Sequence, residues 1–254
     1  MSRNERWQVG ERPFLDVRVP VGTIEVHAGD AGVVQLTIDA GDVDDFEVFQ
    51  AGDRISVRHP SRWRMRGRNS RLVANVPIGT DVEISSASGE IRLIGRLGVV
   101  RIRTASGDVE IDDAARLDVT TASGDVSCGA IGGEANISSV SGDCNLARVG
   151  GRLDATLTSG ALRVDDCGGD VTVSSTSGDV RLARCGGSDI AVRSISGDMR
   201  LGLPSGIRVE AEISTMSGRA TLPEPVPTSD SSDRRPVRLQ LKSVSGDIRV
   251  ERIS

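Results

Sequence analysis

Residues 120–128 read Thr-Thr-Ala-Ser-Gly-Asp-Val-Ser-Cys, and residues 174–182 read Ser-Ser-Thr-Ser-Gly-Asp-Val-Arg-Leu. The Ser-Gly pair in these stretches recurs along the chain and places Gly at positions 89, 107, 124, 142, 160, 178, 197, 218 and 246. The intervals between these glycines are 18, 17, 18, 18, 18, 19, 21 and 28 residues. Self-similarity at a nearly fixed period indicates one structural unit that stacks on copies of itself.

Each repeat alternates apolar and polar residues after its glycine. Val180 and Leu182 are apolar, for example, and Arg181 between them is polar. This period of two predicts a strand with one buried face, and a second alternating stretch such as Val171-Thr172-Val173 gives each coil a second strand. Because an isolated coil cannot bury its apolar face, we predict an all-β fold. It is a parallel β-solenoid of about 18 residues per coil over residues 81–254, right-handed as is usual for wide parallel coils.

The first 80 residues carry the same alternation at irregular spacing. Leu15-Asp16-Val17-Arg18-Val19 and Val34-Gln35-Leu36-Thr37-Ile38 are two such stretches. We therefore predict an irregular N-terminal β cap over residues 1–80, continuous with the solenoid. Residues 223–236 contain four prolines and a run of small polar residues, so we predict a Pro/Ser-rich loop insertion there.

Composition restricts the class of protein. The chain has 254 residues, 37% of them apolar, and a net charge of -5, which argues against nucleic acid as a general partner. No aromatic residue follows Trp63, so small aliphatic side chains must fill the solenoid core. The first residues contain no apolar run of the signal-peptide type, and we therefore expect a cytoplasmic protein, with peripheral membrane attachment as an alternative.

The position after the repeat glycine is acidic in most coils. Stacked carboxylates repel, so they need either a cation such as calcium or hydrogen bonds to the turn backbone. Calcium-binding β-rolls require Gly-Gly-x-Gly-x-Asp at every turn, whereas this chain has Gly-Asp at one turn per coil. We therefore interpret the column as a structural turn column rather than a metal site. Its members are Asp108, Asp125, Asp143, Asp179, Asp198 and Asp247.

Nucleophilic and redox chemistry find little support. Serines and threonines recur one and three residues before the repeat glycine, but the solenoid has no histidine to act as a base, since His27 and His59 lie in the predicted cap. Hexapeptide acyltransferases also have 18 residues per coil, but they need a catalytic histidine and an inward residue every six positions. The four cysteines occupy inward columns and behave as small hydrophobes. We predict no enzyme activity, no metal, no cofactor and no small-molecule substrate.

An arginine-rich segment interrupts the acidic sequence between residues 54 and 71. The candidate membrane- or anion-binding loop consists of Arg62, Trp63, Arg64, Arg66 and Arg68. Tryptophan among arginines suits a lipid headgroup interface, with anionic membrane favoured over nucleic acid. The alternative is a solvated loop that joins two strands.

The Ser-x-Ser-Gly-Asp-Val units resemble a bacterial family of β-strand-repeat domains. Two further segments carry the resemblance, namely Pro20-Val21-Gly22-Thr23-Ile24-Glu25-Val26 and Val76-Pro77-Ile78-Gly79-Thr80-Asp81-Val82. The family is grouped with adhesins and has no established activity, cofactor or catalytic residue. The resemblance implies a β-repeat fold over nearly the whole chain and, through the adhesin label, a surface location.

Three functional hypotheses remain. The first is a non-enzymatic structural or protein-interaction module that binds a protein partner or copies of itself. The second is a peripheral membrane-associated or self-assembling scaffold that uses the arginine-rich loop, similar to bactofilins in architecture only. The third is a cell-surface adhesin.

Overall fold

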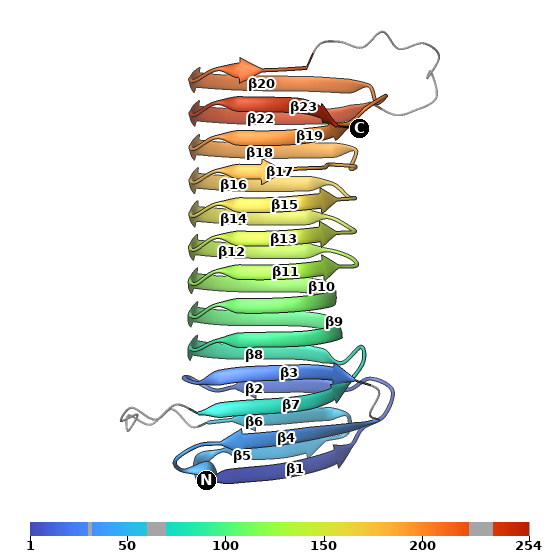
Figure 1. The fold of residues 1–254 in the computed structure, drawn as a ribbon, viewed down its shortest axis with the longest axis vertical. Coiled ribbons are helices and arrows are strands. Elements are labelled where there is room, and N and C mark those ends of the chain that lie inside the picture. Colours follow the sequence, from blue (N-terminus) through green and yellow to red (C-terminus); the bar gives the residue numbers. More distant parts are fainter. Residues whose placement is uncertain (30–31, 60–69, 224–235, 254) are drawn as a thin grey trace. The chain divides into compact units, whose positions relative to one another are not determined.

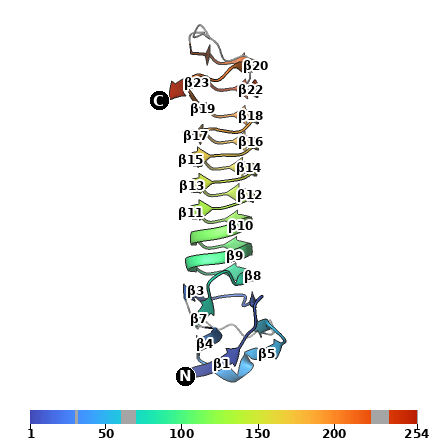
Figure 2. The ribbon, with the colours of Figure 1, turned by 90° about the vertical axis from the view of Figure 1, so that its right-hand side faces the viewer.

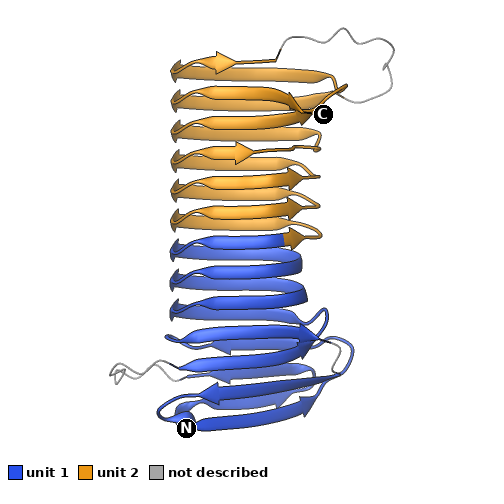
Figure 3. Ribbon diagram, in the orientation of Figure 1, with its two compact units in different colours: residues 1–129 blue, residues 130–254 orange. Residues whose placement is uncertain are grey.

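The computed structural model describes residues 1–29, 32–59, 70–223 and 236–253. The chain divides into two compact units, residues 1–129 and residues 130–254, which Figure 3 colours separately. Both units are all-β and consist mainly of parallel strands that stack coil on coil, so the predicted β-solenoid with an irregular β cap is confirmed (Figure 1). The predicted boundary at residue 80 stays a prediction.

Unit 1 begins with the cap. Its elements are β1 (Ser2–Gln8), β2 (Phe14–Arg18), β3 (Thr23–Gly29), β4 (Val33–Asp39), the 3-10 turn η1 (Val43–Asp45), β5 (Glu47–Ala51), β6 (Arg54–Arg58), β7 (Arg71–Pro77), β8 (Asp81–Ser88), β9 (Ile91–Ser106) and β10 (Val109–Ser123). Strand β11 (Val126–Ile131) crosses the division between the units. Antiparallel pairs occur only in the cap of the described chain, where β4 pairs with β1 and β7, and β5 pairs with β6.

The coils of unit 1 do not stack in the order of the sequence. Strand β2 lies between β6 and β8 and is parallel to both. Strand β3 likewise lies between β7 and β9. Residues 14–29 therefore form a coil that is inserted between two coils that come later in the chain (Figure 1).

Unit 2 has two parallel sheets, which Figure 2 shows edge-on. One sheet contains β12 (Ala135–Ser141), β14 (Leu153–Ser159), β16 (Val171–Ser177), β18 (Asp189–Ser196), β22 (Val237–Ser245) and β20 (Val209–Ser217), in this spatial order. The other contains β13 (Cys144–Val149), β15 (Leu162–Cys167), β17 (Val180–Leu182), β19 (Met199–Pro204), β23 (Ile248–Ile253) and β21 (Ala220–Thr221).

Unit 2 therefore repeats the insertion seen in unit 1. Residues 237–253, which form β22 and β23, lie between the coil of β18 and β19 and the coil of β20 and β21. Residues 209–222, which we call the terminal coil, are outermost in unit 2 although they come earlier in the sequence. Most of the predicted loop insertion, residues 224–235, lies outside the described residues.

The core follows the predicted alternation. Val171, Val173, Val180 and Leu182 are at most 1% exposed, while the residues between them face solvent. Each such layer is one strand spacing, about 4.8 Å, from the next, so aliphatic side chains fill the interior without aromatic rings. The buried apolar layers and the parallel ladders together hold the coils in register.

The turn hydroxyls bond in two different ways and do not form a continuous ladder between the described coils. The buried Thr121 hydroxyl donates to the carbonyl of Ser123 in its own turn, at 3.2 Å. The exposed Ser123 hydroxyl donates to the carbonyl of Ala105 in the preceding coil, at 3.4 Å. Only the outer hydroxyl of this pair links coils, because the inner one satisfies itself locally.

Candidate functional site

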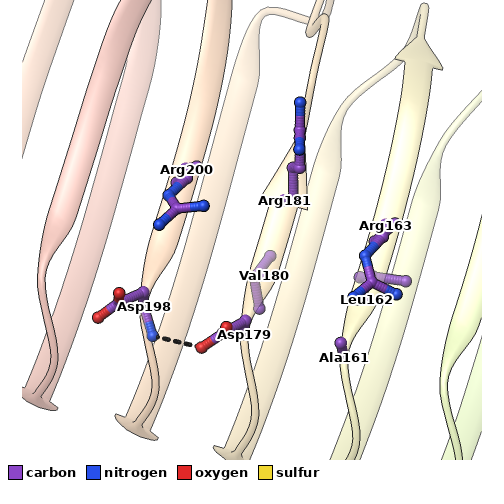
Figure 4. A pocket seen from close by; sticks show the side chains of 8 residues that line it. All are labelled: Ala161, Leu162, Arg163, Asp179, Val180, Arg181, Asp198 and Arg200. Carbon is purple, nitrogen blue, oxygen red and sulfur yellow. Dashed lines mark hydrogen bonds between the residues drawn. The ribbon is translucent and has the colours of Figure 1, made fainter.

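The turn column has a definite hydrogen-bonding pattern. The Oδ1 atom of Asp179 accepts a hydrogen bond from the backbone N–H of Asp198 in the next coil, at 2.9 Å, as Figure 4 shows. Asp198 accepts one from Asp247 N–H in the same way, at 2.9 Å, and Asp108 accepts one from Asp125 N–H at 3.0 Å. Each of these carboxylates therefore satisfies a turn donor of the neighbouring coil, which offsets the repulsion between stacked charges.

Two positions depart from the column, and the structure explains one of them. Arg219 belongs to the terminal coil, where its own N–H donates to Asp247 Oδ1 at 2.7 Å. No described coil stacks beyond it, so a carboxylate at position 219 would have no neighbouring N–H to accept. The departure at Arg219 follows from its place at the end of the stack.

Ala161 is the unexplained departure, because it lies within the stack. Its N–H donates to Asp143 Oδ1 at 2.8 Å, as the pattern requires. Its methyl group, however, offers no acceptor to the N–H of Asp179 in the next coil, and no described residue supplies one in its place. We call this position the Ala161 gap. A shallow pocket opens beside it, lined on its polar side by Ala161, Arg163, Asp179, Arg181, Asp198 and Arg200 (Figure 4).

The same pocket exposes a column of like charges. Arg163 is in register with Arg181, Arg181 with Arg200, and Arg200 with Arg249, so four arginines stack on successive coils of one sheet. We call them the arginine ladder, and all four are exposed. Like charges directly opposite one another on adjacent strands are destabilising.

Acidic partners neutralise only the two ends of the arginine ladder. Arg163 Nη1 lies 3.4 Å from Asp143 Oδ2, and Arg249 Nε lies 4.0 Å from Glu251 Oε1. Within the described residues, the side chains of Arg181 and Arg200 form no ion pair and no hydrogen bond. The middle of the ladder is therefore exposed and has no direct ion pair, although the carboxylates of Asp179 and Asp198 line the same pocket.

The predicted arginine-rich loop cannot be located, since Arg62, Trp63, Arg64, Arg66 and Arg68 lie outside the described residues. The arginines that flank it are engaged in unit 1. Arg54 Nη2 lies 2.9 Å from Asp16 Oδ2, and Arg18 Nε lies 3.1 Å from Asp16 Oδ1. Arg71 pairs with Glu25 at 2.9 Å, and its hydrogen bond holds the pKa of Glu25 below the ordinary value. These flanking arginines therefore form ion pairs within the cap.

The terminal coil is the least covered part of unit 2. Strand β20 pairs with β22 alone among the described strands, so its other edge is open. Residues that would be buried in an inner coil are uncovered here, since Ala211 is exposed and Leu222 is 52% exposed. The turn adds an exposed apolar stripe, in which Ile195, Val244 and Met216 occupy the same position on three successive coils.

The cysteines lie in the core of their coils. All four cysteines, Cys128, Cys144, Cys167 and Cys185, are buried. The backbones of Cys167 and Cys185 pair as an isolated parallel β-bridge between adjacent coils. Burial raises the pKa of both thiols, that of Cys185 to about 12. A thiol with so high a pKa is a poor nucleophile at neutral pH.

In the described part of the chain, no group of three or more His, Cys, Asp or Glu side chains is arranged to hold a metal ion. The described residues also include no helix with the length and apolar character needed to span a bilayer. His27 and His59 both lie in unit 1, where His27 Nε2 is 3.7 Å from Glu25 Oε2.

These features define an all-β repeat protein of stacked parallel coils with a charged outer surface. The model of the Toastrack DUF4097 family matches residues 15–251, and the chain belongs to this family. Membership supports the resemblance to a bacterial domain family of unknown function; the Ser-Gly-Asp-Val label for it stays a prediction.

Two solved structures share the fold. One is a "putative adhesin" from Parabacteroides merdae ATCC 43184, with 9% identity, a TM-score of 0.51, and coverage of 100% of this chain and 96% of that one. The other is a "putative lipid binding protein" from Parabacteroides distasonis ATCC 8503, with 12% identity, a TM-score of 0.52, and coverage of 100% and 97%. Among curated proteins, none matches this chain.

The arginine ladder and the terminal coil were not predicted. In sequence, the ladder residues belong to a polar column that also contains Glu110, Ser127 and Asn145, so they do not stand out. The exact stacking register, which includes the inserted coil of β22 and β23, is needed to bring Arg249 next to Arg200. Ala161 was visible as a break in the repeat, but its effect on Asp179 was not.

Proposed function

We propose that the chain is a non-enzymatic interaction module that associates with a second copy of itself through the terminal coil. The observation that carries this proposal is the open edge of β20. A strand edge with unpaired N–H and C=O groups is a template for another strand. The exposed apolar stripe of Ile195, Val244 and Met216 ends at this coil and would add buried apolar area to the contact.

The edge is suited to a copy of itself. The N–H of Val237 donates to the carbonyl of Arg208 at 2.9 Å, so even-numbered residues of β20 bond to β22. By the alternation of a parallel ladder, Val209, Ala211 and Ile213 then direct their backbone groups to the open edge. A two-fold axis at Ile213 would pair two such edges antiparallel, as in an isologous dimer.

The charges of β20 permit this pairing. With the axis at Ile213, Glu210 of one copy lies opposite Met216 of the other, and Glu212 lies opposite Ser214. No carboxylate then faces a carboxylate directly across the strands. Glu212 is in addition paired with Lys242 of its own chain at 2.7 Å, which lowers the pKa of the Glu212 carboxyl.

Sedimentation velocity over a range of concentrations tests the proposal. Wild type should dimerise, and Ala211→Pro should abolish dimerisation because it removes one N–H from the open edge while leaving the β22 ladder intact. Met216→Glu should weaken the dimer by tenfold or more, because it places a second carboxylate opposite Glu210 of the other copy. Val140→Glu is the matched control, since Val140 occupies the same turn position, is 52% exposed and lies on a coil away from the terminal one.

Two results would overturn self-association. One is a wild type that stays monomeric at all concentrations. The other is a monomer that dimerises only after residues 224–235 are deleted, which would assign the edge to that segment of the same chain. Equal weakening by Val140→Glu and Met216→Glu would show that the dimer does not form through the terminal coil.

Two other functions stay predictions, each favoured by one observation. The adhesin name of the Parabacteroides merdae protein favours a surface adhesin. Detection of the chain outside the cytoplasm would support this function, whereas an exclusively cytoplasmic location would contradict it. Peripheral membrane binding is favoured by the lipid-binding name of the second structure. Liposome co-pelleting with Arg62, Arg64, Arg66 and Arg68 changed to Ala tests it, and equal pelleting by both proteins would exclude the loop.

A further inference from the structure

We propose that the Ala161 gap and the arginine ladder form a binding site for a ligand that carries neighbouring carboxylates, such as an acidic peptide. One ligand carboxylate would take the place that an aspartate occupies in the adjacent coils. The site lies on the outer surface of β15, β17 and β19 and does not involve the open edge of β20. It is therefore independent of self-association.

The backbone at the gap is preorganised for a carboxylate. Gly160, Gly178 and Gly197 have φ angles of 108°, 143° and 124°, so the turns before Ala161, Asp179 and Asp198 all pass through a glycine with positive φ. In that conformation the Asp198 N–H meets the carboxylate of Asp179 at 2.9 Å. The Asp179 N–H is directed by the same geometry to the position that a carboxylate at residue 161 would occupy. An exogenous carboxylate there would restore the pattern.

The charges beside the gap favour the same ligand. The carboxylates of Asp179 and Asp198 also line the pocket, but each already accepts a backbone hydrogen bond on its Oδ1 atom. Arg181 and Arg200 have no acidic partner among the described residues, and they stand one strand spacing apart, about 4.8 Å. A guanidinium binds carboxylate in a bidentate, charge-assisted manner, and an anion between the two would relieve their mutual repulsion.

The Ala161 gap, which interrupts the turn column, lies on the same coil as Arg163, the first residue of the arginine ladder. Unit 1 shows the opposite arrangement at the corresponding column, where Arg92 pairs with Glu110 at 3.3 Å and also with Glu90. There the positive charge is neutralised within the chain. In unit 2 the carboxylate is missing at Ala161 and the arginines accumulate beside it, so the missing negative charge would come from the ligand.

Titration with hexaglutamate, followed by amide NMR of the full chain at low salt, tests the proposal. The Asp179 N–H resonance should move downfield on binding, because it gains a charge-assisted acceptor. Ala161→Asp supplies that acceptor within the chain, so it should weaken binding at least tenfold while leaving stability equal to or above that of wild type. Arg181→Gln should weaken binding severalfold, and raised salt should weaken it further.

Two variants serve as matched controls. Ser174→Asp adds the same negative charge to the other sheet of the adjacent coil, and Arg193→Gln removes an exposed arginine from that sheet. Both should bind hexaglutamate as wild type does. Wild-type affinity in Ala161→Asp, or resonance changes that leave Asp179 unmoved, would overturn the site. Inorganic phosphate or sulfate that bound as tightly as the peptide would overturn the assignment to carboxylates.

Discussion

The turn glycine at position 178 offers the sharpest test of how the coils are held together. Gly178 has a φ of +143°, and a Cβ added there would lie 2.0 Å from the carbonyl oxygen of Gly160 and 2.8 Å from its carbonyl carbon. A φ of this kind costs about 1–3 kcal/mol in other residues. Overpacking against fixed atoms adds about 1–3 kcal/mol, and the atoms here are backbone of the preceding coil. We therefore expect Gly178→Ala to destabilise its coil by about 4 kcal/mol.

Gly206 provides the matched control in the same unit. It also has a positive φ, +79°, but a Cβ there would meet nothing within 4 Å. Gly206→Ala should therefore cost only the conformational strain, about 1–2 kcal/mol, less the gain from a stiffer unfolded chain. The difference between the two variants, about 3 kcal/mol, isolates the contact between successive turns.

Hydrogen exchange detected by mass spectrometry suits this comparison, because coils of a repeat protein open locally. Peptides that cover residues 171–182 should lose protection by nearly a thousandfold in Gly178→Ala, since about 4 kcal/mol is close to three factors of ten at 1.4 kcal/mol each. Peptides from β8 and β9 serve as an internal reference. A loss in Gly178→Ala that matches that in Gly206→Ala within about 1 kcal/mol would refute the contact argument.

Three further predictions concern stability. The pKa of Cys185 is raised by burial from 9.0 to about 12. The contribution of this thiol to the free energy of unfolding is therefore intact below pH 9 and is lost as the pH rises toward 12, by about 4 kcal/mol in total. Urea midpoints at pH 7, 9 and 11 should fall with this slope in wild type and with a smaller slope in Cys185→Ala, in which the buried Cys167 thiol remains. The buried carboxylate of Asp16, whose side chain is 0% exposed, is held by Arg18 and Arg54. Arg18→Ala should cost under about 1 kcal/mol because Arg54 still pairs with the carboxylate, whereas changing both Arg18 and Arg54 to Ala leaves the buried charge with only Arg58, 4.0 Å away, and should cost about 3 kcal/mol; equal costs would contradict the ion-pair geometry. Asp198→Ala should cost about 1 kcal/mol through the lost turn acceptor, and Arg219→Ala should be neutral within about 0.5 kcal/mol, because nothing stacks on its turn. Equal effects at these two positions in urea unfolding would rule out the end-of-stack explanation.

The sequence predicts the structure of each coil but not the order in which the coils stack. Val180 and Leu182 could be assigned to the core because a period of two allows only one buried face. The inserted coils could not be found in this way, since residues 209–222 and 237–253 both carry the Ser-Gly turn and the same alternation. Two units with the same pattern can exchange places in a stack. Only Arg219, in place of the turn aspartate, marks the coil that lies outside.

The candidate site has the same limit. The absence of a carboxylate at Ala161 is plain in the aligned repeats, but its consequence depends on which backbone N–H it leaves without an acceptor. That pairing is a property of the stack. The arginine ladder likewise arises from residues 18, 19 and 49 positions apart, a spacing that no local motif describes.

The inserted coil at residues 237–253 also determines the order in which unit 2 can be completed. Gly197 and Gly246 stack directly although 49 residues separate Asp198 from Asp247 in the chain. During synthesis, residues 209–222 emerge before residues 237–253, the coil on which they rest in the finished stack. Until then the edges of β18 and β19 are open to β20 and β21, so the native order requires residues 237–253 to take that place and to close a long loop in doing so. A chain that ends before residue 237 would therefore present a different end of unit 2 from the full-length chain.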